Sequence, residues 1–416
     1  MTLAATLAHP TGESDLVKAG VKLDAELIAR LHELGVPWLS IAFEPLSTLD
    51  RHICLCDSEA ALALRRLSRE LYGRSTADPH RELPLGRVYG VIRELLLQVA
   101  SLAGRGLYYE LQPRDADDLP GHAAEVATLS LLLGSRLERY VIKQRHRLPP
   151  QHARELINLG VGALLHDIGK TRQDATLRKF HVARPPGDTA ARGEWQSHTR
   201  LGYELVKDGV EASAATAVLH HHQHMDGSGF PRLVINGKRL PCAGTRLHVF
   251  ARIVAVANAY NRLTWDPSTG TRLTPLEALA KVRALGTGRL DGVVVKALHE
   301  VCPPFPPGST VTLDDGSSAV VVQVNEQDVF RPIVRRLGQP SGDEALPVLA
   351  DEAIDLHSDR SRRIVRVATL DTAGLTLEPS ALEAIGQWPG DDDTPAPSTF
   401  VGDDATIKAD ELGTAA

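Results

Sequence analysis

Apolar residues recur at spacings of three and four through most of the chain between residues 119 and 301. This spacing places them on one face of successive α-helices, so the region is predicted to fold as a helical bundle around an apolar core. Several histidines lie on the same stripes as these apolar residues. A buried polar ring needs a partner, and a metal ion is one such partner for histidine. The bundle is therefore predicted to enclose a polar site as well as a core.

The sequence on either side of this bundle has a different character. Asp24 is predicted to cap a helix over residues 25–34, VPWLSIAF to form a strand, and two helical segments to follow. Beyond residue 301, a proline cluster precedes two β-rich runs that flank the Asp315-Gly316 turn, and SRRIVRVATL predicts another strand. The end of the chain is acidic and aperiodic, which predicts disorder.

A mainly α fold is therefore expected, with a small mixed α/β N-terminal unit and a small β C-terminal appendix. The expected domains are an N-terminal mixed and helical region (1–118), a helical domain (119–301), a β-rich appendix (302–380) and a disordered acidic tail (381–416).

Charge and composition argue against several classes of protein. The formal net charge is −6 and aromatic residues make up 4% of the chain, so binding to a nucleic-acid polymer is not expected. The sequence lacks a run of 18 apolar residues and a signal peptide, which predicts a cytoplasmic protein without a membrane span. The four cysteines are too few and too scattered for a disulfide scaffold or a four-sulfur zinc site.

Three segments place a histidine where a helix is predicted to be buried. His122 begins one such helix, and His198 lies on the inner face of another. LLHDIGK, residues 164–170, places His166 and Asp167 at the end of an apolar helix, and this mixture of imidazole and carboxylate suits Fe, Mn or Zn. Each residue taken alone also fits a helix cap or a core histidine with satisfied hydrogen bonds.

A fourth segment is AVLHHHQHMDGSGFP, residues 217–231. His221 and His222 are predicted to continue an inward-facing helix. Consecutive helical residues point about 100° apart, so both reach one cavity only if two metal ions, or a metal ion and a substrate, lie between them. The glycines permit positive φ and the proline restricts the exit, so DGSGFP predicts a tight, shaped substrate loop. Its residues of interest are Asp226, Gly227, Gly229, Phe230 and Pro231.

The segment RLHVFARIVAVANAYNRL predicts a helix with Asn258 and Asn261 on its inner face, and Asn258 comes four residues after Val254. Leaving a buried amide without a partner costs roughly 1–3 kcal/mol, so a partner is expected. A metal ion, a bound water, a neighbouring histidine and a hydrogen bond to another helix all remain open.

Taken in order, His122, HDIGK, His198, HHxxxDGxGFP and VAxAY resemble the HD-GYP family of metal-dependent phosphohydrolases, which cut the bacterial messenger cyclic di-GMP. The resemblance covers about residues 119–300, and FPPGSTVTLDDG is similar to a common appendix of such proteins. It implies an HD-type helical bundle with two divalent metal ions, Fe or Mn. It implies one metal ion held by His122, His166 and Asp167, with Asp167 bridging to a second held by His198, His221 and His222.

The resemblance also assigns functions to residues outside these two sets. Lys170 is similar to the family lysine that meets a substrate phosphate, which makes it a candidate catalytic residue with Asp167. Asp118 occupies the position of a glutamate that holds a third metal ion in some members, but its carboxylate is shorter. Asn258 stands where the family has the aspartate of VAD, and an amide oxygen brings no charge to a metal ion.

Three further positions depart from the family pattern. The glutamate of HHE is Gln223, and GYP has become GFP, which keeps the ring and loses the hydroxyl. The arginine-bearing RPYR segment is replaced by WDPSTGTRL, in which Arg272 aligns poorly. We expect these changes to affect rate and substrate binding more than fold.

Three functions remain open on the sequence. The first is hydrolysis of cyclic di-GMP to the linear dinucleotide or GMP. The second is a catalytically weakened domain that binds cyclic di-GMP or a protein partner. The third is another HD-type phosphohydrolase acting on nucleotides such as dNTPs. A homodimer and a signalling-protein partner are compatible with all three.

Overall fold

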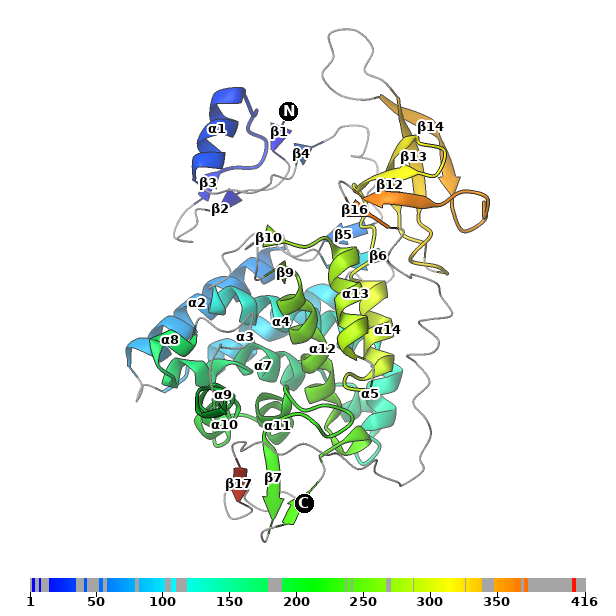
Figure 1. Cartoon of the computed structure of the whole chain (residues 1–416). Helices are drawn as coiled ribbons and strands as arrows, with labels where there is room; N and C mark the ends of the chain where they lie inside the picture. Colours follow the sequence, from blue (N-terminus) through cyan, green and yellow to red (C-terminus); the bar gives the residue numbers. More distant parts are fainter. Residues whose placement is uncertain are drawn as a thin grey trace. The chain divides into compact units, whose positions relative to one another are not determined.

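The computed structural model of the chain forms two compact units (Figure 1). One combines residues 1–57, 104–115 and 302–379, and the other combines residues 58–103, 116–301 and 380–416. Within these units the structure describes residues 2–3, 7–8, 15–34, 41–42, 52–54, 58–78, 82–101, 106–109, 118–178, 189–235, 238–240, 242–266, 271–286, 288–325, 327–338, 348–367, 370–372 and 406–408.

The N-terminal part of the first unit contains short strands and helix α1 (Ala25–Glu33). Asp24 caps α1, because its Oδ1 accepts a hydrogen bond from the backbone N–H of Leu27 at 2.8 Å. A small core forms where Leu31 of α1 is buried together with Leu3 and Leu23. The strand pairs are β1 (Thr2–Leu3) with β4 (Ile41–Ala42), β2 (Leu7–Ala8) with β3 (Asp15–Val17), and β5 (His52–Cys54) with β6 (Gly106–Tyr108). The predicted cap is confirmed, and only Ile41–Ala42 of the expected strand VPWLSIAF is assigned as a strand within the described residues.

The C-terminal part of the same unit is a six-stranded antiparallel sheet in the order β14-β13-β12-β11-β15-β16. Gly316, at φ +82°, lies in the tight turn between β11 and β12, at the predicted Asp315-Gly316 position. The β-rich appendix is thus confirmed in the described residues. Its strands are β11 (Thr310–Leu313), β12 (Ser318–Gln323), β13 (Ile333–Gly338), β14 (Val348–Asp355), β15 (Ile364–Val367) and β16 (Leu370–Asp371).

Helix α4 (Leu119–Arg136) is the central element of the second unit, because every residue from Gly121 to Gly134 is buried. It packs against helices from far apart in the sequence: α2 (Glu59–Ala77), α7 (Ile157–Leu165), α12 (Val249–Leu263) and α14 (Gly292–Val301). Helix α11 (Ala212–His220) packs in turn against α7 and α12. The mainly α bundle predicted from the apolar spacing is confirmed.

The remaining elements of this unit surround that centre (Figure 1). No helix in the described ranges is both long enough and apolar enough to cross a lipid bilayer. The elements are α3 (Leu85–Ser101), α5 (Glu138–Gln144), α6 (Pro150–Ala153), the 3₁₀ helix η3 (Ile168–Arg172), α8 (Ala175–Arg178), α9 (Thr189–Gln196), α10 (His198–Val206), β7 (Arg232–Ile235), β8 (Lys238–Leu240), η4 (Gly244–Arg246), β9 (Trp265–Asp266), β10 (Thr271–Arg272), α13 (Pro275–Gly286) and β17 (Thr406–Lys408).

The compact units differ from the expected domain ranges, because residues 58–103 belong to the helical unit and residues 302–379 belong to the same unit as residues 1–57. Helices α2 and α3 belong to the helical unit, although the expected boundary at residue 118 placed them in the N-terminal region. The reason is packing: Tyr72 of α2 is buried and donates its hydroxyl to the carbonyl of Leu164 at 2.9 Å. The expected disordered tail, 381–416, lies outside the described residues except for β17, which pairs in parallel with β7.

Candidate metal centre

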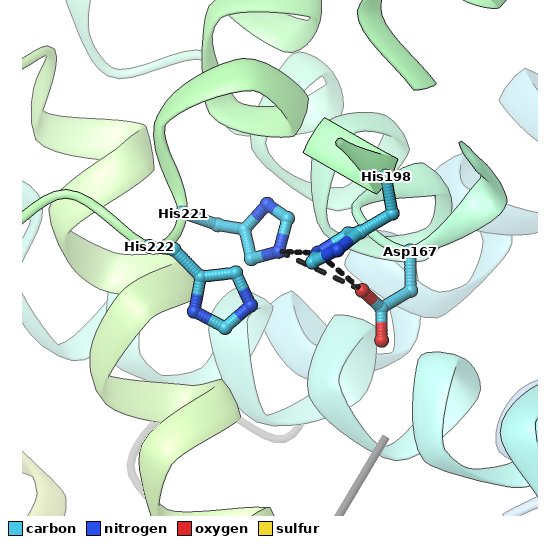
Figure 2. A group of neighbouring side chains, drawn as sticks. All are labelled: Asp167, His198, His221 and His222. Carbon is cyan, nitrogen blue, oxygen red and sulfur yellow. Dashed lines mark hydrogen bonds and ion pairs between the residues drawn. The ribbon is translucent and has the colours of Figure 1, made fainter. Parts of the chain in front are cut away.

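Six side chains that are distant in sequence converge inside the helical unit. They form two groups that share Asp167, and within each group one potential ligand atom per residue lies within 4.8 Å of the others. Figure 2 shows the larger group, with the rings of His198 and His221 beside the Asp167 carboxylate and His222 next to them. The groups are His122, His166 and Asp167, and Asp167, His198, His221 and His222.

The two oxygens of Asp167 face different histidines. Oδ2 lies 3.4 Å from Nε2 of His166 and 3.6 Å from Nε2 of His122. Oδ1 lies 3.2 Å from Nε2 of His198 and 3.6 Å from Nε2 of His221. One carboxylate oxygen therefore belongs to each group, which is the arrangement that a bridging ligand between two cations requires.

Three of the histidines are held by the same backbone contact. A carbonyl oxygen only accepts hydrogen bonds, so in each ring Nδ1 carries the proton and donates it. In the neutral ring Nε2 is then left with a free lone pair, and this lone pair is directed at the centre. The partner is the carbonyl three residues earlier in every case: Ala163 for His166 at 2.7 Å, Trp195 for His198 at 2.6 Å, and Val218 for His221 at 2.8 Å.

His122 is oriented by a side chain instead. Its Nδ1 lies 2.7 Å from Oδ1 of Asn261, whose Nδ2 donates to Glu125 at 2.6 Å. The bond to Glu125 determines which end of the amide faces His122, so the amide oxygen accepts from Nδ1 and Nε2 again has the lone pair. Sequence reasoning identified Asn261 only as an inner position of its helix and did not predict its role as a partner of His122.

These tautomers bring unprotonated nitrogens face to face. Nε2 of His122 lies 3.2 Å from Nε2 of His166, and Nε2 of His198 lies 3.3 Å from Nε2 of His221. Neither atom of such a pair has a hydrogen to donate, so their lone pairs repel unless a cation binds them. Oδ1 of Asn258 is also buried without a hydrogen-bond partner. The donor set therefore fits divalent metal ions that accept imidazole and carboxylate ligands.

The protonation states of the centre suit metal binding. Burial lowers the pKa of His221 to about 4, and burial together with the Lys170 ammonium holds the pKa of His198 well below its ordinary value. Burial by itself would raise the pKa of Asp167, but the Lys170 ammonium, with Nζ at 2.6 Å, holds it well below the usual range. Neutral imidazoles and an ionised carboxylate are the forms that bind metal ions.

Lys170 is buried with Asp167, and each side chain is only 1% exposed. Burial lowers the pKa of the Lys170 ammonium, while the contact with Asp167 opposes that shift. In the structure its ammonium contacts the bridging carboxylate, and the expected contact with a substrate phosphate stays a prediction.

A close backbone approach holds the HDIGK turn against α10. A Cβ atom on Gly169 would lie 2.0 Å from the carbonyl oxygen of His198 and 2.4 Å from the nitrogen of Gly202, so only glycine fits. Asp167 is the N-cap residue of η3, but its side chain makes no capping hydrogen bond. Its carboxylate is therefore left to face the histidines.

His221 and His222 lie after helix α11, which ends at His220. The prediction that both residues continue the helix is wrong, because the chain turns there into the DGSGFP loop. Phe230 folds back on the turn: its ring stacks on His222 with centroids 4.6 Å apart, and its N–H donates to the His222 carbonyl at 3.1 Å. A Cβ atom on Gly229 would lie 2.3 Å from that carbonyl oxygen. The loop thus positions His222, and the Phe230 ring makes the contact with the His222 ring.

Two expected residues are not brought into these groups. Asp118, the candidate ligand for a third metal ion, caps α4 by accepting a hydrogen bond from the Gly121 N–H at 2.8 Å, and it belongs to neither group. The side chain of Arg272 lies outside the described part of the structure.

Trp195 and Arg262 lie beside the centre, although the sequence did not predict either as part of the site. Trp195 is 2% exposed, and its ring centroid lies 5.4 Å from that of His198 and 5.5 Å from that of His222. The guanidinium carbon of Arg262 lies 5.8 Å from the centroid of the same indole. The only sequence signal for Arg262 is its position one residue after the inward-facing Asn261, which gives no information on its neighbours.

A comparison with protein families matches a segment that contains every proposed metal ligand except His122. A family model described as an HD domain matches residues 128–294. A cyclic di-GMP phosphodiesterase of Pseudomonas aeruginosa is 27% identical over 215 residues, which are 51% of this chain and 46% of that protein. The chain thus spans about half the length of this curated relative.

A solved structure, that of an HDG"Y"P protein from Bdellovibrio bacteriovorus, is similar with a TM-score of 0.41 and 14% identity, over 72% of this chain and 95% of that one.

Proposed function

Because the chain carries an HD domain of the HD-GYP type, we propose that this domain is a metal-dependent phosphodiesterase that hydrolyses cyclic di-GMP to the linear dinucleotide or GMP. The observation that supports the proposal is a pair of facing Nε2 atoms on each side of the Asp167 carboxylate, His122 with His166 and His198 with His221. Side chains that only stabilise a core would not be expected to place lone pairs against lone pairs.

Each proposed ligand is assigned to one of two metal ions. When bound, two divalent metal ions, Fe or Mn, polarise a phosphodiester and lower the pKa of water. Asp167 would bridge them, and Asn258 would contribute its unpaired amide oxygen as an uncharged ligand to the first. The other ligands would be His122 and His166 on the first metal ion, and His198, His221 and His222 on the second.

Lys170 has two functions in this proposal. Its ammonium keeps Asp167 ionised in a buried site, where a carboxylate alone would tend to take up a proton. It also carries the proton closest to the bridging carboxylate, 2.6 Å from Oδ2. We assign to it a charge-assisted hydrogen bond to the phosphate and protonation of the leaving alkoxide. The loop from Asp226 to Pro231 would form a wall of the substrate site.

The test is turnover by the full chain, purified without oxygen and loaded with Fe(II) or Mn(II). Cyclic di-GMP should yield the linear dinucleotide or GMP, Asp167→Asn should abolish the reaction, and Asn258→Asp should accelerate it by restoring a charged ligand. Asn158→Asp, on α7, is the matched control and should leave the rate unchanged. If neither the unchanged chain nor Asn258→Asp turns over cyclic di-GMP with either metal ion, the phosphodiesterase proposal is refuted.

One observation favours a second candidate, a domain that binds cyclic di-GMP or a partner without cutting it. Asp167 is the only carboxylate in the two ligand groups found among the described residues, so the centre is poor in negative charge. Fewer than two metal ions per chain, together with tight binding and no turnover, would favour this candidate. A third candidate, hydrolysis of other nucleotides, is tested by adding dNTPs and guanosine tetraphosphate to the same assay.

A further inference from the structure

Arg262 places a positive charge beside the centre at a position that neither ligand group uses. It lies in the last turn of α12, four residues after Asn258, so the two side chains leave neighbouring points on the helix surface. Its guanidinium carbon is 5.8 Å from the centroid of the Trp195 indole. That indole contacts the rings of His198 and His222, two of the proposed ligands. Arg262 is therefore separated from the second ligand group by a single ring.

The same indole has a second cation beside it. Nζ of Lys170 also lies 5.8 Å from the Trp195 centroid. The charge of Arg262 adds to the lowering of the pKa of Lys170 and of His222, after the larger effect of burial, so it acts electrostatically on the centre. Like charges that interact at close range destabilise each other, and an anion bound beside them removes that cost.

The expected substrate has two phosphates, which matches the two cations Lys170 and Arg262. A cyclic dinucleotide contains two phosphodiesters in one ring, and only one of them can be cleaved at a single metal centre. Lys170 contacts the bridging Asp167 and so belongs to the cleaved phosphate. A planar guanidinium binds phosphate oxygens through two parallel hydrogen bonds, which suits a residue that orients a substrate.

We propose that Arg262, positioned by Trp195, binds the second phosphate of a cyclic dinucleotide, the one that is not cleaved. The proposal rests on the proposed function of the same centre. It also supplies an arginine to a domain whose sequence lacks the expected RPYR segment. The substrate would then be held at two points, and a phosphodiester with a single phosphate would make only one of these contacts.

The experiment compares the manganese-loaded full chain with Arg262→Gln, Arg262→Lys and a control, Arg139→Gln, which changes an exposed arginine of α5. Isothermal titration with a hydrolysis-resistant bis-phosphorothioate analogue of cyclic di-GMP measures binding. Turnover of cyclic di-GMP is compared with turnover of bis(p-nitrophenyl) phosphate, which has one phosphate. Metal per chain and melting temperature are measured for every variant.

Arg262→Gln should weaken binding of the analogue roughly 10- to 100-fold, the loss expected for a charge-assisted hydrogen bond. The loss should appear in KM for cyclic di-GMP rather than in kcat. Arg262→Lys should recover part of it, and turnover of bis(p-nitrophenyl) phosphate should be unchanged. Equal affinity of Arg262→Gln and the unchanged chain, or an equal loss on both substrates, overturns the proposal.

The two proposals fail in different ways. If the unchanged chain binds the analogue but neither it nor Asn258→Asp cleaves cyclic di-GMP with Fe(II) or Mn(II), the phosphodiesterase proposal fails. The ratio of the affinities of the unchanged chain and Arg262→Gln then still decides the role of Arg262. If the unchanged chain cleaves cyclic di-GMP and Arg262→Gln binds equally well, only the Arg262 proposal fails. Absence of binding by the unchanged chain, together with no turnover by it or by Asn258→Asp, overturns both.

Discussion

Replacing Asn261 by leucine is expected to weaken metal binding without changing a proposed ligand. Oδ1 of Asn261 accepts a hydrogen bond from His122 Nδ1 at 2.7 Å, and its Nδ2 donates one to Glu125 at 2.6 Å. Leucine has a similar size but neither polar atom, so His122 loses the partner that keeps its proton on Nδ1. The ring can then carry the proton on Nε2, the atom that faces His166 at 3.2 Å, and in that form Nε2 cannot bind a metal ion.

The magnitude follows from the two hydrogen bonds that are lost. Removing the hydrogen-bond partner behind a metal-binding histidine typically lowers metal affinity about 10- to 100-fold, which corresponds to about 1.4–2.7 kcal/mol. Both bonds of Asn261 are buried, and each contributes about 0.5–1.5 kcal/mol net to folding. The metal-free variant should therefore lose about 1–3 kcal/mol of unfolding free energy.

Two measurements separate these effects. Competition with a fluorescent chelator gives the Mn(II) affinity well below the melting temperature, and urea unfolding in EDTA gives the stability of the metal-free chain. Asn158→Leu is the control, because Asn158 is also an amide on a helix of this unit but its Oδ1 accepts from Tyr89 at 3.3 Å. It should leave metal affinity unchanged. A folded Asn261→Leu variant that binds Mn(II) as tightly as the unchanged chain would refute the tautomer argument.

Three further changes test separate parts of the chain. Arg252→Leu breaks the buried ion pair with Asp291 at 2.8 Å and should lower the free energy of unfolding by about 3–5 kcal/mol. Urea unfolding measures this loss, the metal content should stay constant, and a smaller loss would contradict a stabilising role for that pair. Phe230→Leu removes the ring stacked on His222 and should lower the affinity for the second metal ion about tenfold, as measured by calorimetry. An unchanged affinity would argue against positioning of His222 by the loop. Burial lowers the pKa of His299 from 6.5 to about 4, so between these pH values only the unfolded chain takes up a proton at this residue. Its contribution to stability should fall by up to about 3 kcal/mol as pH drops from 6.5 to 4. Other buried histidines share this pH range, so His299→Phe should reduce the slope of stability against pH in urea unfolding by that contribution, and an unchanged slope would count against it.

Local rules predicted the helices and the buried faces that carry the candidate site. Asp24 caps α1 as its position before an amphipathic segment indicated. His122 is buried on α4, and Asn258 and Asn261 are buried on α12, as their spacing from apolar neighbours indicated. These predictions succeed because helical periodicity depends only on residues a few positions apart.

The end of α11 shows where local rules fail. The run of histidines after Leu219 continues a helical pattern, yet the helix ends at His220. After the helix, the loop from Asp226 to Pro231 returns to the His222 backbone, where Phe230 donates a hydrogen bond. That contact depends on the shape of the whole loop, and the spacing of apolar residues does not encode it.

By itself the sequence determined which side chains face the core and which motifs lie in order along the chain. Tertiary structure alone decided that Asn261 orients His122, 139 residues away, and that Trp195 brings Arg262 beside the centre. It also placed α2 in the helical unit. Periodicity tells which face of a helix is buried, but the partner on that face depends on how entire helices pack, because each contact joins residues that no local spacing relates.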